Sequence, residues 1–480
     1  MQRFRASKHV RQLFHPFQRG LPHLRPGQQW YVASILINAL GTGLYYPFAV
    51  LYGHQVVGLS FPLVGLALSV AKGVSLATIP LQGALVDRFG ARTLQIAAHL
   101  IRVVGFLGFL LAHSLPVFLL LATLVALGDS TPAGDALVAD FAAPEELDRW
   151  YGLDRVLFNA GVGAGAVLGG VAVATGGTGG YQVIVVLNAV SFVAAAGMLT
   201  RLPTQTTRTT SPTGSPATPS NPSAALEASG GESRAARHGV SGYRAILRDH
   251  SFLVLLIVSV VFWMSNYSID IVLAPYCVSV LRTPLWVPGA LFALNTALVV
   301  GAQAPVTGLL ASRRRTRALM VGGIGYMVVF LALAGTPLLP AHTLVGALGA
   351  LMLLATMAEI ILAPTMTALA AAMAPLHLRG RYLALANLSL STAIAITPLV
   401  ATTLLATIPA AFWLILTVAL IVAVAAVAWL ERRLPIATVL GPADALQRSR
   451  HASPAGDDEP GMAASEALTA QNPATAPGHP

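Results

Sequence analysis

The most constraining feature of this chain is a series of long apolar stretches. About 20 apolar residues cross the ~30 Å hydrocarbon layer of a membrane as a helix. Lipid offers no hydrogen-bond partner to the backbone, so each stretch must pair its own N–H and C=O groups as a helix. Twelve stretches have this character: 29–51, 61–85, 93–112, 116–140, 152–174, 181–200, 251–276, 286–311, 318–336, 342–372, 382–406 and 408–430. The sequence therefore predicts an all-α, polytopic membrane protein with twelve transmembrane helices.

Composition excludes the other broad classes. Only 10% of the 480 residues are charged, against roughly 25% in soluble domains. The net charge of +10 is spread along the chain rather than gathered on one domain, so no nucleic-acid partner is expected. The single cysteine, Cys277, and the scattered histidines exclude a disulfide framework and predict no metal site.

The basic residues predict the orientation. All Lys and Arg residues except Lys72, Arg102 and Arg282 fall within, or at the edge of, alternate segments between the apolar stretches, beginning with the N-terminal segment. Cytoplasmic loops of membrane proteins carry such an excess of Lys and Arg. Both termini are therefore expected in the cytoplasm, in a multi-pass protein of the cell (plasma or inner) membrane. No cleavable signal peptide is expected, because no apolar core with a small-residue cleavage site follows the basic N-terminus.

The chain divides into two similar halves. Two six-helix halves, 29–200 and 249–432, are joined by a Ser-, Thr- and Pro-rich segment, 201–248, that is typical of a flexible cytoplasmic linker. A cytoplasmic N-tail, 1–28, precedes them and a tail with the composition of disorder, 433–480, follows them. Similar basic segments, 83–92 and 308–317, follow the second stretch of each half. Duplicated halves of this kind place a substrate site near the membrane midplane between them.

Four ionisable residues lie near the middle of apolar stretches: Lys72, Arg102, Asp129 and Glu359. A charge at this depth costs at least about 2.5–3.5 kcal/mol on insertion scales, which makes each one a functional candidate. Asp135 lies nearer the cytoplasm. We expect Arg102 to pair with Asp129 or Asp135 as a structural contact, with Lys72 as a second candidate partner for Asp129.

Glu359 has no basic residue near it in its own half. The repeat places it opposite Gly128, one residue from the counterpart of Asp129. A carboxyl group without a basic partner in a low-dielectric setting is suited to exchange protons. The alternative is a neutral carboxyl that is hydrogen-bonded to Thr356 or to a backbone carbonyl.

Polar side chains on three other stretches are candidates to line a substrate cavity. They are Asn38, Thr42 and Tyr45 in the first stretch, Asn266 and Tyr267 in the seventh, and Asn387 in the eleventh. Polar residues also hold transmembrane helices together. Asp270 lies near the outer end of its stretch, where hydration makes it less informative, and Gln95 and His99 share one helical face with Arg102.

The segment Gly83-Ala-Leu-Val-Asp-Arg-Phe-Gly-Ala-Arg92 resembles the loop motif of the major facilitator superfamily, G-x-L-x-D-R-x-G-x-R, at every fixed position. In that family the motif governs closure between the two halves on the cytoplasmic side. The resemblance therefore implies a gating role for Gly83, Asp87, Arg88, Gly90 and Arg92. The alternative is a basic anchor that only sets topology.

A second motif departs from the family pattern. The glycines Gly161, Gly165, Gly169 and Gly170 resemble the fifth-span motif of the family's exporters, but Ala166 stands where that motif has proline. The arginine that drug/proton antiporters carry in the fourth span is also missing from 127–130. The glycines alternatively serve only close helix packing.

The resemblance, to the drug/metabolite proton antiporter type, implies a monomeric secondary transporter and not an enzyme. It would export small organic or amphipathic molecules by alternating access, using the proton gradient and no cofactor. Its partners would be the lipid bilayer, the substrate and protons. The alternatives are a metabolite importer or uniporter of the same fold, or a transporter-like membrane sensor. No nucleophile–base constellation and no Walker phosphate loop occurs in the sequence.

Overall fold

The structure is a computed structural model that describes residues 24–129, 131–142, 146–203, 246, 248–310, 313–375 and 378–440. The expectations for the N-terminal segment up to residue 23, for the linker between 204 and 245, and for the tail beyond 440 lie outside these residues. Every regular element within the described residues is a helix. The all-α prediction is confirmed for them.

The first two expected stretches are bent helices. The first consists of α2 (Gln29–Tyr45), a short 3₁₀ turn η1 (Tyr46–Phe48) and α3 (Ala49–Gln55). The second consists of α4 (Phe61–Ala77) and α5 (Ile79–Phe89), which meet at 51°. Pro47 and Pro80 lie at these breaks, because proline removes a helical hydrogen bond and its ring clashes with the preceding turn.

The fourth stretch is interrupted where the sequence predicts a continuous helix over 116–140. After α6 (Ala91–Phe109), the chain forms α7 (Leu115–Leu127) and α8 (Thr131–Phe141). Gly128 and Asp129 lie outside both helices. Pro132 has no N–H to donate to the carbonyl of Gly128, and glycine itself is a poor helix former. The break places Asp129 at the end of a helix rather than within one.

The fifth and sixth stretches form one element, α9 (Leu147–Leu199), whose backbone leaves the helical conformation at Gly177 with φ of 52°. This positive φ is readily adopted by glycine. A Cβ on Gly180 would meet the Ala172 carbonyl oxygen at 2.2 Å, so the chain folds back tightly on itself here. The expected separation into 152–174 and 181–200 agrees with this reversal.

The remaining elements follow the expected stretches closely. They are α11 (His250–Pro275) with a π-helical turn η3 (Tyr276–Val280), α12 (Trp286–Leu310), α13 (Arg315–Gly335), η4 (Thr336–Leu338), α14 (Ala341–Met373), α15 (Arg379–Thr407), α16 (Pro409–Arg433) and α17 (Ile436–Val439). Pro305, Pro364 and Pro398 lie inside α12, α14 and α15.

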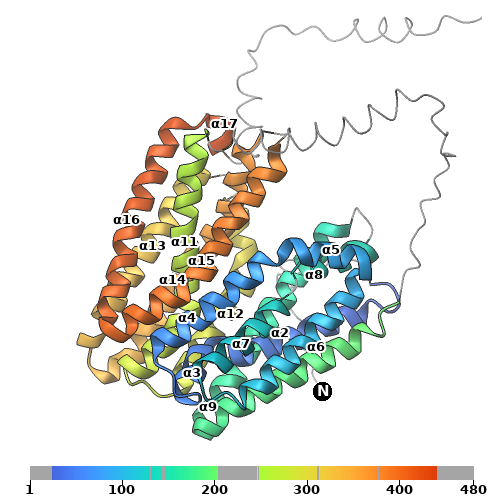
Figure 1. Ribbon diagram of the computed structural model, residues 1–480. Coiled ribbons are helices and arrows are strands. Elements are labelled where there is room, and N and C mark those ends of the chain that lie inside the picture. Colours follow the sequence, from blue (N-terminus) through green and yellow to red (C-terminus); the bar gives the residue numbers. More distant parts are fainter. Residues whose placement is uncertain are drawn as a thin grey trace, which may run out of the picture.

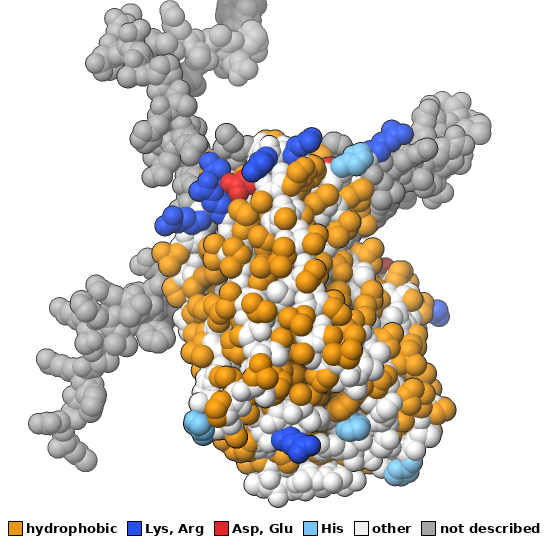
Figure 2. Space-filling view, turned by 90° about the vertical axis from the view of Figure 1, so that its left-hand side faces the viewer, with side chains coloured by type: hydrophobic (Ala, Val, Ile, Leu, Met, Phe, Trp, Pro, Cys, Tyr) orange, Lys and Arg blue, Asp and Glu red, His pale blue; other side chains and the backbone are white. Residues whose placement is uncertain are grey.

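Eight helices in the described residues are long and apolar enough to cross a membrane, or nine when the bent pair α4 and α5 is counted as one span. The face in Figure 2 is covered by hydrophobic side chains, with Lys and Arg side chains gathered at its upper end. Large apolar side chains of α13 and α16 are exposed, among them Val321, Leu331, Val418 and Val422. Such a surface suits lipid rather than water. The total of twelve spans stays a prediction.

Two equivalent hydrogen bonds reflect the sequence repeat. Helices up to α9 lie on one side of the molecule and most of the later helices on the other (Figure 1). The Tyr52 hydroxyl donates to the Phe109 carbonyl oxygen at 2.9 Å, and the Tyr276 hydroxyl donates to the Leu333 carbonyl oxygen at 2.8 Å. Each bond joins residues 57 apart in the sequence. The first and third helices of each group are therefore tied in the same way.

The two groups of helices touch at the end away from the basic segments. There α4 packs on α15 and α9 packs on α12. The Leu399 amide donates to Ser69 Oγ at 3.0 Å, and a Cβ on Gly170 would lie 3.0 Å from Gly289 Cα. At the basic end a Cβ on Gly83 would meet nothing within 4 Å.

Candidate functional site

A cavity of about 710 Å³ lies between the two groups of helices. Its lining includes residues of α2, α4, α6 and α9 from one group and of α11, α12, α14 and α15 from the other. Asp135 and Gln303, near the basic ends of their helices, belong to this lining. With the opposite end packed shut, the cavity opens toward the basic end of the molecule. Of the candidate lining residues, the structure places Asn38, Thr42, Tyr45 and Tyr267 here.

Lys72 and Asp129 form an ion pair across the cavity wall. Lys72 Nζ lies 2.7 Å from Asp129 Oδ2, joining α4 to the break between α7 and α8. Their side chains are 34% and 43% exposed, so the pair faces the cavity rather than a dry core. Asp129 was expected to be paired. The partner is the second candidate, Lys72.

Arg102 makes a different contact from the expected one. Its guanidinium carbon lies 4.4 Å from the centroid of the Phe192 ring, a cation–π arrangement. Among the described residues no ion pair involves Arg102. The prediction that it pairs with Asp129 or Asp135 was therefore wrong. Ring stacking could not be anticipated, because Phe192 lies about 90 residues away along the chain.

Glu359 is held by an amide rather than by a cation. Asn295 Nδ2 on α12 donates to Glu359 Oε2 at 3.0 Å and to Thr356 Oγ1 at 3.0 Å. The Thr356 hydroxyl itself donates to the Met352 carbonyl oxygen. No ion pair within the described residues includes Glu359. Asn295 is a neighbour that the sequence did not single out.

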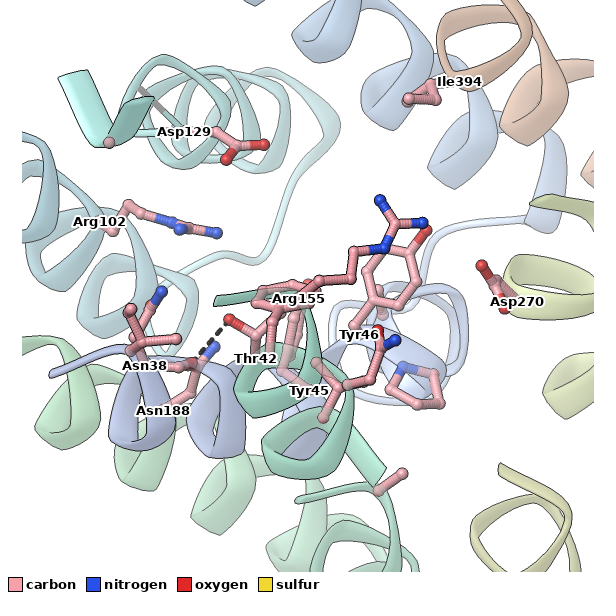
Figure 3. A pocket seen from close by; sticks show the side chains of 18 of the residues that line it. Asn38, Thr42, Tyr45, Tyr46, Arg102, Asp129, Arg155, Asn188, Asp270 and Ile394 are labelled. Atoms are coloured by element: carbon pink, nitrogen blue, oxygen red, sulfur yellow. Dashed lines mark hydrogen bonds between the residues drawn. The ribbon is translucent and has the colours of Figure 1, made fainter. Parts of the chain in front are cut away.

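Three charged residues that the sequence did not single out also line the cavity, namely Asp154, Arg155 and Asp270. Asp270 on α11 and Arg155 on α9 line it, and Figure 3 shows Arg155 extending into the space between Tyr46 and Asp129 with Asp270 opposite. Asp270 lies near the outer end of α11, as expected, but the cavity reaches that depth. The spacing of Tyr151, Arg155 and Asn159 at every fourth residue indicates one polar helical face.

Two candidate lining residues lie elsewhere. Asn266 Nδ2 donates to the Tyr326 hydroxyl oxygen on α13 at 3.1 Å, and Asn387 is exposed on α15 outside the cavity lining. Asn266 therefore ties helices together, as the alternative reading of polar residues predicted. By contrast Gln95, His99 and Arg102 of α6 all line the cavity.

The loop motif lies at the open end of the molecule. Gly83 and Asp87 are on α5, and Gly90, with φ of 81°, ends that helix. Arg92 Nε donates to the Leu199 carbonyl oxygen at 2.8 Å, which ties the start of α6 to the end of α9. The Arg88 guanidinium lies over the Phe89 ring at 5.2 Å. Asp87 is exposed and belongs to no ion pair in the described residues.

The fifth-span glycines pack directly against another backbone. A Cβ on Gly161, Gly165 or Gly169 would lie 3.0, 2.1 or 2.5 Å from a carbonyl oxygen of α2. Gly170 faces Gly289 of α12 instead. Three glycines thus allow α2 and α9 to approach closely within one group of helices. The fourth lies in the contact between the two groups.

Within the described residues, no group of three or more His, Cys, Asp and Glu side chains could hold a metal ion. The cavity combines charged groups of both signs with aromatic and aliphatic walls. Such a lining can bind an organic molecule and change its own charge by taking up a proton.

Curated relatives match part of the chain. It is 30% identical over 142 residues to the uncharacterized MFS-type transporter YttB of Bacillus subtilis (strain 168) and 32% identical over 144 residues to the multidrug resistance protein MdtH of Aeromonas hydrophila. Each match covers 29% of this chain and 36% of the relative. The matches therefore span about a third of the length of these relatives.

Solved transporter structures share the fold. The nucleoside transporter NupG superposes with a TM-score of 0.66 at 12% identity, over 84% of this chain and 99% of that one. A bacterial homologue of the human lysosomal transporter Spinster, in an inward-facing and occupied conformation, superposes with a TM-score of 0.63 at 13% identity, over 88% of this chain and 100% of that one.

The sequence profile of the Major Facilitator Superfamily matches residues 31–388. This range includes the loop motif at 83–92, the fifth-span glycines and the charged residues that line the cavity. Membership in a transporter family also meets the expectation that the chain is not an enzyme. The chain belongs to the Major Facilitator Superfamily.

Proposed function

We propose that the protein is a secondary active transporter that exchanges protons for small organic molecules and exports them by alternating access. One observation carries this proposal. Glu359 lines a cavity between two groups of helices, accepts a hydrogen bond from Asn295 and belongs to no ion pair in the described residues. A carboxyl group so placed can be reached by both a proton and a substrate, and competition between them couples the two movements.

The cavity fits a small organic molecule. Its volume of about 710 Å³ falls within the roughly 300–1,000 Å³ of small-molecule sites. Charged side chains line it from both groups of helices, among them Lys72, Asp129, Arg155, Asp270 and Glu359. An amphipathic molecule with a polar or charged group suits this lining better than a plain hydrocarbon. The multidrug resistance relatives favour export as the direction.

A twelve-span arrangement in two six-helix halves is part of the proposal. The reversal of α9 at Gly177 and the broken fourth stretch account for helices that are too long or too short to count as single spans. The matching Tyr52 and Tyr276 hydrogen bonds support a duplicated half. With the basic end in the cytoplasm, the cavity faces inward.

The loop motif acts in this account as a gate at the cytoplasmic end. Asp87 is exposed while that end is open, and Gly83 has space on its outer side. Closure brings the second half against this surface and gives Asp87 partners such as helix N-terminal amides. The contact then stabilises the inward-closed state only.

Transport by purified protein in liposomes tests the proposal. Uptake of a panel of small amphipathic compounds is measured with the lumen acidic, with the lumen alkaline and without a pH gradient. Proton-coupled export predicts uptake driven by an acidic lumen, because protons then leave as the compound enters. Uptake driven only by an alkaline lumen indicates a symporting importer, and uptake that is indifferent to the gradient indicates a uniporter. Either result overturns the proposed function.

A further inference from the structure

A set of buried polar side chains lies within the N-terminal group of helices, on the far side of the cavity from Glu359. They come from α2, α6 and the second part of α9, which correspond to the first, third and sixth spans. The set, called the α6 pocket below, consists of Asn38, Tyr45, Gln95, His99, Arg102 and Asn188. All six line the cavity.

Each member of the α6 pocket has a buried polar atom without a hydrogen-bond partner among the described residues. Six of the eleven such atoms in this part of the chain gather here: Asn38 Oδ1, Tyr45 OH, Gln95 Oε1, His99 Nδ1, Arg102 Nε and Asn188 Nδ2. His99 and Asn188 are only 2% and 1% exposed. A buried polar atom left unpaired costs about 1–3 kcal/mol. Six together point to a bound group that pairs with them.

Aromatic rings fix the pocket in place. Phe192 lies beneath the Arg102 guanidinium at 4.4 Å and beside the His99 ring at 5.7 Å. Phe106 stacks on Phe192 with a centroid distance of 5.6 Å. Figure 3 shows Arg102 directed into the cavity, with Asn38 and Asn188 on the same side. The guanidinium is thus held by stacking, which leaves its N–H groups free to bind a ligand.

The local charge favours an anion. The Asp129 carboxylate is already paired with Lys72 at 2.7 Å. Arg102 itself belongs to no ion pair in the described residues. Its guanidinium and the Asn188 amide both donate hydrogen bonds, and guanidinium matches a carboxylate in a two-point geometry. Four other carboxylates line the cavity. Asp135 on α8 and Asp154 on α9 belong to the same group of helices as Arg102, and Asp154 accepts a hydrogen bond from the Tyr31 hydroxyl at 3.2 Å. Asp270 and Glu359 lie on the second group of helices.

We propose that the α6 pocket binds the carboxylate of an organic anion, with Arg102 and Asn188 as the donors. The apolar body of the anion then lies against Phe106 and extends into the main cavity toward Glu359. This inference rests on the proposed function, since it names the chemical class of the transported molecule. In this arrangement Arg102 of the third span and Asn188 of the sixth span contact the transported molecule in the cavity between the two groups of helices.

Benzoate and benzamide are matched probes for this pocket, because they share one ring and differ in charge. The thermal unfolding of purified protein in lipid nanodiscs is measured with each probe, against sodium chloride at equal ionic strength. A ligand that binds only the folded state raises the unfolding temperature. Benzoate is expected to stabilise the protein at concentrations at least about tenfold lower than benzamide, as the loss of a charged hydrogen bond predicts.

Substitutions locate the effect. Arg102→Gln should remove the preference for benzoate, and Asn188→Leu should weaken benzoate binding while filling the same space. Arg201→Gln is the matched control, because Arg201 also lies over an aromatic ring, Trp30, but outside the cavity. It should leave the preference unchanged. If Arg102→Gln does not fold, Arg102→Lys serves instead and should show a reduced preference, since lysine keeps the charge but not the two-point geometry.

Equal stabilisation by the two probes, no stabilisation by benzoate, or an undiminished preference in the Arg102 variants would each overturn the proposal. Binding and transport are measured separately, so the two proposals fail separately. A benzoate preference that depends on Arg102 without pH-driven transport refutes the proposed function alone. Proton-driven transport without that preference refutes the organic-anion pocket alone.

Discussion

In each half of the chain a polar contact joins the second predicted span to the fourth, and the two contacts differ in charge. Lys72 and Asp129 form an ion pair in the first half of the chain, whereas Asn295 donates a neutral hydrogen bond to Glu359 in the second. The same topological position thus carries a fixed charge pair in one half and a carboxyl without a cation in the other. We infer that the first link positions helices and that the second is free to change its protonation.

The Lys72–Asp129 pair gives a test at this scale. Asp129→Asn should lower the unfolding temperature of the detergent-solubilised protein, because it leaves the Lys72 ammonium without its partner. Both side chains are partly exposed, so the cost should fall between the roughly 0.2–1 kcal/mol of a surface pair and the roughly 3–5 kcal/mol of breaking a buried one. The double variant Lys72→Gln/Asp129→Asn should recover part of this loss. Losses that simply add would contradict a direct pair.

For single residues, the sequence predicted which side chains line the cavity more accurately than it predicted their contact partners. The cost of charge in lipid singles out Lys72, Arg102, Asp129 and Glu359, and all four line the cavity. The partner of Arg102 could not be predicted, because helical spacing gives the face of a side chain but not the helix opposite. Arg155 was missed because it lies near a basic segment and counted as a topology signal.

The glycine stripe of α9 shows how one element constrains another. Gly161, Gly165 and Gly169 follow a spacing of four residues and face the backbone of α2. The spacing predicted a packing face from the sequence. The break of the fourth stretch at Gly128 was not predicted, since apolar periodicity continues through it and only Gly128 and Pro132 signal the interruption.

Replacement of one glycine tests this packing. Gly165→Ala would place a Cβ 2.1 Å from the Leu40 carbonyl oxygen, closer than any normal contact. We expect a loss of folded protein, measured by fluorescence-detected size exclusion of a fusion. Gly197→Ala is the matched control on the same element, because its Cβ would meet nothing within 4 Å. Equal yields of the two variants would show that α2 and α9 are not in close contact.

A substitution in the loop motif at 83–92 tests whether α5 takes part in gating. Asp87 is exposed, so Asp87→Asn should leave the free energy of unfolding within about 0.5 kcal/mol of the wild-type value. Transport in liposomes should nevertheless fall, because the inward-closed state loses a contact. Unchanged transport at normal expression would reduce the motif to a topological anchor.

At the scale of the whole molecule, the open end of the cavity coincides with the basic segments. The positive-inside rule predicts that this end is cytoplasmic, and we expect the linker between the halves on the same side. A cysteine placed at Ser211, in a chain with Cys277→Ser, should not react with a membrane-impermeant thiol reagent on intact cells. It should react once the membrane is permeabilised. Robust labelling of intact cells would reverse the orientation.

Proton coupling through Glu359 can be separated from substrate binding by comparing gradient-driven uptake with exchange. Wild type and Glu359→Gln are reconstituted in liposomes with a transported compound, and both gradient-driven uptake and compound exchange without a gradient are followed. Glutamine retains a side-chain oxygen that can accept the Asn295 hydrogen bond but cannot release a proton. Glu431→Gln, at an ion pair outside the cavity, is the matched control.

Glu359→Gln should abolish uptake driven by the pH gradient while exchange continues, and Glu431→Gln should retain both. Loss of both activities with normal folding would show that Glu359 serves binding rather than coupling. Full gradient-driven uptake by Glu359→Gln would contradict the account and move the proton site to Asp129, Asp135 or Asp270.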